Sequence, residues 1–166
     1  MREHLDEATK YCLISDVEIG AFLSGGIDST AVVGLMTQVG GKKINTYALG
    51  FEDKLSSIDE RKFAKIASDH LNSNHIGKAT TIDDAKNIFN NIVKDIDQPS
   101  IDGANTWIVS KMAAAKNKVA LSGLGGDEIF AGYSHFFKFS KEKNNFLSNL
   151  NFLKKYIEKI HSIRPN

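Results

Sequence analysis

One short stretch, residues 24–29 of sequence Ser-Gly-Gly-Ile-Asp-Ser, constrains the fold more than any other. It follows the apolar run 17–23, which predicts a central strand, and precedes a helical pattern over 28–38. A strand, a tight glycine turn and a helix together form a phosphate site, because they aim backbone N–H groups at one point. Gly25 and Gly26 carry no Cβ and let the backbone approach a ligand closely. Ser24, Ser29 and Thr30 add hydroxyl donors.

The stretch is not a Walker loop, since the chain contains no Gly-x-x-x-x-Gly-Lys-Ser/Thr motif and so lacks the lysine that reaches the β- and γ-phosphates. Asp28 lies inside the turn instead. A carboxylate beside phosphates is costly unless a divalent cation lies between them. The turn therefore predicts a cradle for pyrophosphate and Mg²⁺. An ordinary glycine turn, with Asp28 capping the helix, is the structural alternative.

A second glycine loop, residues 122–128 of sequence Ser-Gly-Leu-Gly-Gly-Asp-Glu, repeats the design. It follows the apolar run Val119–Leu121 and precedes a short helical run over 129–131. Ligands of open α/β sheets bind beyond the carboxyl ends of the strands, near the point where strand order reverses. Loops on adjacent strands would face one ligand from both sides, and Asp28 and Asp127 would then share one metal ion. The alternative for Asp127 is again a helix cap.

The rest of the chain alternates between strand and helix patterns, which favours an α/β fold with a parallel sheet and helices on both faces. We expect strands at 44–49 and 74–76, and helices at 2–13, 57–71, 81–93 and 105–116. The loop 95–103 contains three acids, of which Asp97 and Asp102 are either site residues or solvated. Cys12 is expected to be a buried apolar residue. His70 and His75 are expected to be exposed or capping residues rather than metal ligands.

These motifs carry a family resemblance. Residues 23–29 resemble the PP-loop of the N-type ATP pyrophosphatases. With residues 122–133 and 47–53, the last of sequence Tyr-Ala-Leu-Gly-Phe-Glu-Asp, they resemble the synthetase domain of the glutamine-dependent asparagine synthetases. The likeness covers about 16–136. It implies an adenine nucleotide alpha hydrolase-like (PP-loop ATP pyrophosphatase) fold over residues 1–137. Residues 138–166 would be a basic helical C-terminal extension, with seven Lys or Arg against two Glu.

The resemblance also implies a chemistry and its residues. The family enzyme uses ATP and Mg²⁺ to adenylate a carboxylate, by default aspartate, with release of pyrophosphate, and ammonia then displaces AMP. Asp28 and Asp127 would hold Mg²⁺ and, with Glu128, are the candidate catalytic residues. Pyrophosphate would contact Ser24, Gly25, Gly26 and Ser29. The nucleoside would contact Leu23, Leu49, Ser122 and Gly123, with the Leu49 backbone against adenine.

Some features depart from the family pattern. Leu124 stands where many asparagine synthetases have Glu, which leaves the acceptor acid open. Glutamine-dependent members begin with a glutaminase domain whose nucleophile is a cysteine after the initiator Met, whereas residue 2 here is Arg. The family's catalytic lysine lies beyond the matched part. We therefore expect a partial synthetase that alone does not make asparagine from glutamine. The alternatives are a nucleotide-binding module without complete catalysis, or a related PP-loop enzyme with another acceptor.

Charge and composition exclude other classes of protein. The formal net charge of +1 provides no field that would attract nucleic acid or membrane, so we expect neither as a partner, and RNA binding by the basic extension is the weaker alternative. No apolar run approaches the roughly 20 residues of a membrane span, and the charged start lacks a signal-peptide core. A single cysteine excludes an internal disulfide and a cysteine-built metal site. These features predict a cytoplasmic protein.

Overall fold

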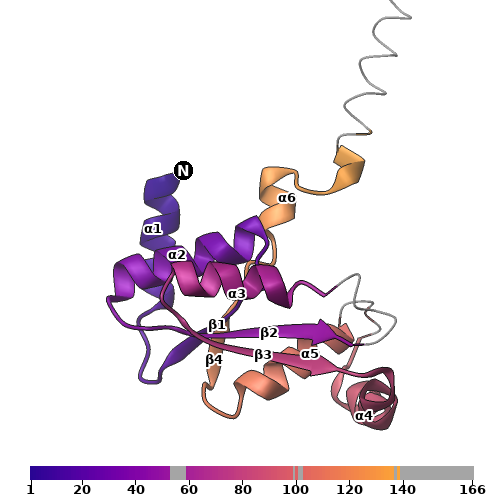
Figure 1. The fold of residues 1–166 in the computed structure, drawn as a ribbon. Helices are drawn as coiled ribbons and strands as arrows, with labels where there is room; N and C mark the ends of the chain where they lie inside the picture. Colours follow the sequence, from indigo (N-terminus) through magenta and orange to yellow (C-terminus); the bar gives the residue numbers. More distant parts are fainter. Residues whose placement is uncertain (53–58, 99, 101–102, 137, 139–166) are drawn as a thin grey trace, which may run out of the picture. The chain divides into compact units, whose positions relative to one another are not determined.

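The computed structural model describes residues 1–52, 59–98, 100, 103–136 and 138 (Figure 1). The chain divides into two compact units, residues 1–124 and 125–166. Asp102 and nearly all of the expected basic extension lie outside the described residues, and the expected boundary at 137/138 stays a prediction. None of the helices that the structure describes has the length and apolar content that a membrane span requires.

The first unit is built on a parallel sheet of four strands in the order β3-β2-β1-β4. The strands are β1 (Ile19–Phe22), β2 (Asn45–Phe51), β3 (Asn74–Thr80) and β4 (Val119–Leu121). β1 is interior, as expected, and pairs with β2 on one side and β4 on the other. The chain moves outward from β1 to β3 and then returns to the other side of β1. The reversal of strand order therefore lies between β1 and β4, whose following loops carry the two glycine motifs.

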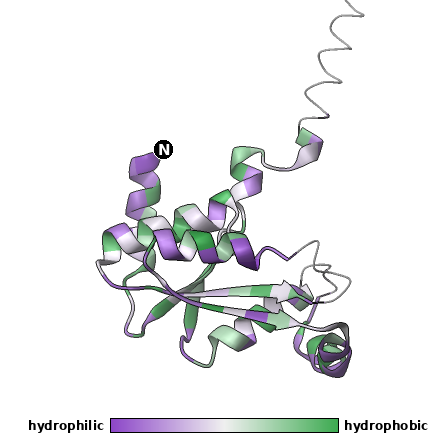
Figure 2. Cartoon of the chain, viewed as in Figure 1, coloured by the Kyte–Doolittle hydropathy of each residue, from purple (hydrophilic) through white to green (hydrophobic). Residues whose placement is uncertain are grey.

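Helices cover both faces of this sheet. Figure 1 shows α2 (Ile27–Gly40) and α3 (Arg61–His70) on one face and α5 (Gly103–Ala113) on the other. The core under α2 and α3 contains the fully buried Ala21, Leu23, Val33, Met36 and Ala64. The helices carry hydrophilic and hydrophobic residues together (Figure 2). The predicted α/β architecture is confirmed.

The two remaining helices of this unit lie outside that core. α1 (Arg2–Cys12) packs against α2. α4 (Ile82–Asp95) begins with a capping box, in which Thr81 Oγ1 accepts from the Asp84 N–H at 3.0 Å and the Asp84 carboxylate accepts from the Thr81 N–H at 3.3 Å. These bonds satisfy N–H groups that a helix start leaves without partners.

Several element boundaries differ from the expectation. β3 runs to Thr80 rather than ending at residue 76, and His75 is half-buried within this strand. Its sequence, Asn-His-Ile-Gly-Lys-Ala-Thr, has weak strand propensity, but β2 pairs with it along its whole length. Tertiary pairing thus overrides local preference. α5 begins at Gly103, two residues before the expected start.

Apolar residues at helical spacing are only partly buried in α1 and α3. On α1, Leu5 and Tyr11 are 40% and 66% exposed and Cys12 is exposed, so the expectation of a buried cysteine is wrong. On α3 and at its C-cap, Ala67 and Leu71 pack against the core, but Phe63 and Ile66 are 60% and 59% exposed, while Ala64 and Ser68 are buried. The N-terminal part of α3 lies so close to the loop after β1 that only small residues fit between them. Spacing alone could not reveal that approach.

Candidate functional site

The loops that follow β1 and β4 touch each other at the carboxyl edge of the sheet. A Cβ built on Gly123 would lie 2.6 Å from the backbone N of Ser29 and 2.9 Å from the carbonyl carbon of Asp28. A side chain at position 123 would therefore cover the Ser29 N–H group. The absence of a side chain keeps that donor accessible and allows the two loops to meet.

The loop after β1 presents open backbone donors. Gly25 has a φ of +88°, in the left-handed region, and Gly26 is the N-cap of α2. The first intrahelical bond runs from the Thr30 N–H to the Gly26 carbonyl at 3.0 Å. The N–H groups of residues 27–29 precede that bond and have no partner among the described residues, so they are available to an anion.

Hydroxyl groups line the same loop. Ser24 Oγ and Ser29 Oγ lie 3.0 Å apart, and Ser24 Oγ also accepts from the Gly26 N–H at 3.2 Å. Thr30 Oγ1 is buried and has no hydrogen-bond partner among the described residues. Buried hydroxyl groups are normally bonded. The loop therefore has a hydroxyl group that no described protein atom binds and that could donate to a ligand.

α3 holds this loop and the end of β2 from one side. A Cβ on Gly25 would lie 2.5 Å from both the Ala64 N and the Phe63 carbonyl carbon, so the loop rests directly on the α3 backbone. The Arg61 guanidinium pairs with the Asp59 carboxylate at 2.6 Å, and together they occupy the space over Gly50. The hydrogen bonds from Arg61 lower the pKa of Asp59 and keep it ionised.

A cavity of about 230 Å³ opens beside the loop, at the carboxyl ends of β1 and β2 and against α5. Three of the predicted nucleotide-binding residues line it, namely Leu23, Ser24 and Leu49. The remaining lining residues are Phe22, Tyr47, Ala48, Phe51, Glu60, Asn105, Thr106 and Val109. The walls combine apolar side chains with the polar groups of Ser24, Glu60, Asn105 and Thr106.

The polar residues of α5 and Glu60 were missed by the sequence analysis. Asn105 and Thr106 lie in the first turn of α5, and Glu60 is the N-cap of α3. The β2 residues that line the cavity could have been grouped from the sequence, because alternate residues of a strand share a face. No local pattern indicates which helix start reaches that wall.

The second glycine loop, residues 122–128, is divided between the two units of the chain. In the first unit, Ser122 Oγ accepts from the Leu124 N–H at 3.2 Å, and Leu124 is 87% exposed. In the second unit, Asp127 and Glu128 lie in the first turn of α6 (Gly126–Phe130). The Glu128 carboxylate accepts from the Tyr133 hydroxyl at 2.7 Å. Glu128 is thus held by its own chain.

Neither Asp28 nor Asp127 caps a helix in this structure. The N-caps of α2 and α6 are Gly26 and Gly125, and neither helix start has a side-chain cap bond. Among the described residues, neither carboxylate has a hydrogen-bond or ion-pair partner, and no group of three His, Cys, Asp or Glu could hold a metal. Mg²⁺ binds through one or two carboxylates together with substrate phosphates, and each of these two carboxylates taken by itself suits that role. Asp97 is exposed.

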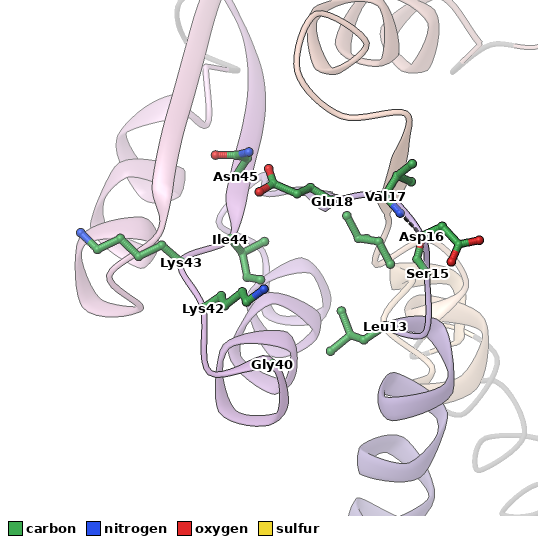
Figure 3. Close-up of a pocket in the computed structure, with 11 residues that line it drawn as sticks. Leu13, Ser15, Asp16, Val17, Glu18, Gly40, Lys42, Lys43, Ile44 and Asn45 are labelled. Atoms are coloured by element: carbon green, nitrogen blue, oxygen red, sulfur yellow. Dashed lines mark hydrogen bonds between the residues drawn. The ribbon is translucent and has the colours of Figure 1, made fainter.

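A larger cleft, of about 390 Å³, lies at the opposite edge of the sheet, by the amino ends of β1 and β2. Figure 3 shows Glu18 pointing toward Asn45 and Lys43 extending away from it. This cleft contains none of the predicted site residues. Because ligands of parallel sheets bind at the carboxyl ends of the strands, the smaller cavity is the better candidate site.

Comparison with known families assigns the chain. Residues 1–163 match the family model described as asparagine synthase. The chain belongs to the asparagine synthase family. Among curated members, it is 39% identical over 132 residues to the putative glutamine-hydrolysing asparagine synthetase 2 of Methanocaldococcus jannaschii, covering 78% of this chain. It is 33% identical over 136 residues to the glutamine-hydrolysing asparagine synthetase 1 of Bacillus subtilis, covering 81% of this chain.

The alignments cover most of this chain but only a small part of each relative. The alignments cover 25% and 21% of the two relatives, so the chain spans about a quarter of their length. The predicted resemblance is confirmed, and the activity of the whole relatives does not transfer directly to this chain.

Solved structures agree on the fold of this asparagine synthase family chain. An NH₃-dependent NAD synthetase from Campylobacter jejuni aligns with a TM-score of 0.52 at 17% identity, over 80% of this chain and 58% of that one. An NMN synthetase from Francisella tularensis aligns with a TM-score of 0.50 at 18% identity, over 72% and 53%. These neighbours confirm the predicted PP-loop fold.

Proposed function

We propose that this chain is the ATP-binding part of an amide-forming ligase that adenylates a carboxylate. One observation carries the proposal. The cavity lined by Leu23 and Leu49 lies beside a loop whose backbone donors at 27–29 are open, and the loop after β4 touches that same loop at Gly123. A pocket of mixed apolar and polar lining that adjoins an anion cradle matches a nucleotide, with its flat base and its charged phosphates.

Each part of the nucleotide has protein groups that suit it. The base would lie against Leu49, with the Leu49 backbone at its polar edge, and the fully buried Leu23 would support that wall from behind. Ser122 and Gly123 would complete the nucleoside site. The pyrophosphate would take the open N–H groups, with Gly25 and Gly26 allowing close approach. Ser24 and Ser29 now bond to each other at 3.0 Å, and a rotation of either hydroxyl would point its proton at a phosphate oxygen.

Asp28 and Asp127 would hold Mg²⁺, which supplies positive charge to the pyrophosphate when bound. Both carboxylates lack protein partners among the described residues, which leaves their oxygens available to a metal ion. Glu128 is a weaker catalytic candidate, because its carboxylate already accepts a hydrogen bond from Tyr133.

The reaction we propose has two steps. A carboxylate oxygen of the acceptor attacks the α-phosphorus, the bond between the α- and β-phosphates breaks, and pyrophosphate leaves. Ammonia then attacks the acyl carbon, AMP leaves, and the nitrogen loses a proton to give the amide. Open N–H groups stabilise the charge that develops on the leaving pyrophosphate. The names of the relatives support aspartate as acceptor and glutamine as the source of ammonia.

Calorimetric titration of ATP, with Mg²⁺ and with EDTA, tests the nucleotide site. We expect Mg²⁺ to raise the affinity of the unaltered chain for ATP about tenfold, equivalent to about 1.4 kcal/mol. Asp28→Asn should abolish this gain. Asp16→Asn is the matched control, because Asp16 lines the cleft at the opposite edge. Equal Mg²⁺ dependence in all three chains would remove Asp28 from the metal site, and no ATP binding at all would overturn the proposal.

The alternative, a nucleotide-binding module without catalysis, is separated by exchange of radiolabelled pyrophosphate into ATP. Adenylation of a carboxylate is reversible, so exchange that depends on added aspartate indicates a ligase. Glutamate at the same concentration is the control for acceptor choice. ATP binding without exchange in the presence of any acid favours the module.

A further inference from the structure

The turn after α6 folds back onto the two acids that begin this helix. Ala131 ends the helix in the left-handed region, with φ 57° and ψ 40°. The Gly132 N–H donates to the Asp127 carbonyl at 3.0 Å, and the Tyr133 hydroxyl donates to the Glu128 carboxylate at 2.7 Å. Residues 131–133 therefore contact the first turn of α6 through both main chain and side chain.

Gly132 lies directly against the Asp127 carboxylate. A Cβ built at position 132 would overlap Asp127 Oδ1 and lie 3.0 Å from its Cγ, whereas the nearest main-chain atom of Asp127, Cα, is 3.4 Å away. The obstacle is thus the end of a rotatable side chain. The φ of Gly132 is outside the left-handed region, so the backbone at this position would accept alanine without strain.

We propose that Gly132 is a positioning residue for Asp127, because it leaves room for the rotamer in which the Asp127 carboxylate holds Mg²⁺. The inference rests on the proposed function, in which Asp127 is a metal ligand. An added methyl group would displace Oδ1 by rotating the Asp127 side chain. Mg²⁺ requires near-octahedral geometry at about 2.0–2.1 Å, so such a displacement removes the ligand while the helix remains.

Stacked rings fix the turn from its other end. The Tyr133 and His135 rings are nearly parallel with centroids 5.2 Å apart, and the His135 and Phe136 centroids are 4.5 Å apart. Tyr133 is thus held both by the rings and by Glu128. We therefore expect a methyl group at position 132 to displace the rotatable end of the Asp127 side chain rather than the main chain of the turn.

The test uses the full chain in four forms, namely unaltered, Gly132→Ala, Asp127→Ala and the double variant. We expect Gly132→Ala to melt at or above the unaltered temperature, since Gly→Ala at a compatible backbone position stabilises by about 0.4–1 kcal/mol. Its affinity for ATP with Mg²⁺ should fall about tenfold, while its affinity in EDTA should not change. In the Asp127→Ala background, Gly132→Ala should add nothing, because the displaced group is absent.

Gly40→Ala is the matched control, since a Cβ there meets only Leu13 Cδ1 at 3.6 Å, an ordinary contact. It should leave both affinities unchanged. If Asp127→Ala loses the Mg²⁺ dependence but Gly132→Ala keeps it, the positioning role fails and the proposed function stands. If Asp127→Ala binds like the unaltered chain, the metal assignment of Asp127 and the positioning role fail together. A Gly132→Ala chain that cannot fold in either background would overturn the inference, because the overlap would then involve the main chain.

Discussion

Gly25 occupies a position that the backbone and its surroundings reserve for glycine. Its φ of +88° is unfavourable for residues with a Cβ, and the Ala64 N and Phe63 carbonyl carbon stand 2.5 Å from where that Cβ would be. Both obstacles are main-chain atoms of α3 and cannot rotate away. The neighbouring Gly26 has a φ of −68° and open surroundings apart from Ser24 Oγ at 3.3 Å.

These differences predict unequal costs for two similar substitutions. Gly25→Ala should lower the free energy of unfolding by about 2 kcal/mol or more, from strain and overlap together. Gly26→Ala should cost less than about 1 kcal/mol, the scale of an N-cap change. Urea denaturation of both variants measures this. Equal costs would mean that α3 does not press against the loop.

His75 lies in a hydrogen-bonded group of small polar side chains between β2, β3 and α3. Its Nδ1 is 3.0 Å from Thr46 Oγ1, and Thr46 Oγ1 is 3.0 Å from Ser73 Oγ. Its Nε2 is buried without a partner among the described residues. Burial lowers the pKa of His75 below its ordinary value of 6.5, Lys65 lowers it further, and Asp69 opposes the shift.

The lowered pKa predicts the direction of a pH effect. Below about pH 6.5 the unfolded chain binds a proton at His75 more readily than the folded chain does, so the free energy of unfolding decreases as pH falls. Above that pH, His75 is neutral in both states and this loss of stability is absent. His75→Gln should therefore show a smaller loss of unfolding free energy between pH 7.5 and 5.5. His70→Gln is the control, because His70 is exposed at the end of α3. Parallel losses in both variants and the unaltered chain would exclude His75 as the cause.

At the scale of elements, one buried side chain links three segments of the sheet. Asn117, which is 4% exposed, accepts from Tyr47 Oη at 2.5 Å and from Asn45 Nδ2 at 3.1 Å, and donates to the Glu18 carbonyl at 3.0 Å. The turn before β4 is thereby joined to β2 and to the residue that precedes β1. These bonds align the strands whose far ends carry the site.

Asn117→Ala should be strongly destabilising for this reason. It leaves the buried Tyr47 hydroxyl without its acceptor, and the lost bonds predict a cost of roughly 2–4 kcal/mol in unfolding free energy. Lys116→Ala, at the exposed neighbouring position, should cost less than about 0.5 kcal/mol. Chemical denaturation gives both values. A cost for Asn117→Ala no larger than that of the control would show that the bonds contribute nothing net.

At the scale of the whole molecule, a ligand that binds only the folded state should stabilise it by mass action. ATP at about 100 times its Kd should add about 2.7 kcal/mol to the free energy of unfolding. We therefore expect ATP with Mg²⁺ to raise the melting temperature, and AMP or Mg²⁺ alone to raise it less. Asp28→Asn should lose most of the shift while melting normally without ligand. An unshifted transition at saturating ATP would contradict the proposed site.

The sequence by itself determined the fold class and the location of the glycine loops, because these depend on local patterns. Apolar runs, glycine turns and helical spacing predicted the parallel sheet, and the family resemblance supplied the candidate residues from Leu23 to Glu128. Such features are visible locally because a strand that is buried on both faces must be apolar, and a left-handed turn such as that at Gly25 strongly favours glycine.

Only the tertiary structure decided which surfaces meet. It set the exposure of Phe63 and Cys12, extended β3 to Thr80, and brought Asn105 and Thr106 to the cavity. Each depends on how closely two distant segments approach, which no local spacing records. The same holds for Gly123 against Ser29 and for Gly132 against Asp127. The need for glycine at these positions comes from an atom outside the local sequence pattern that a side chain would overlap.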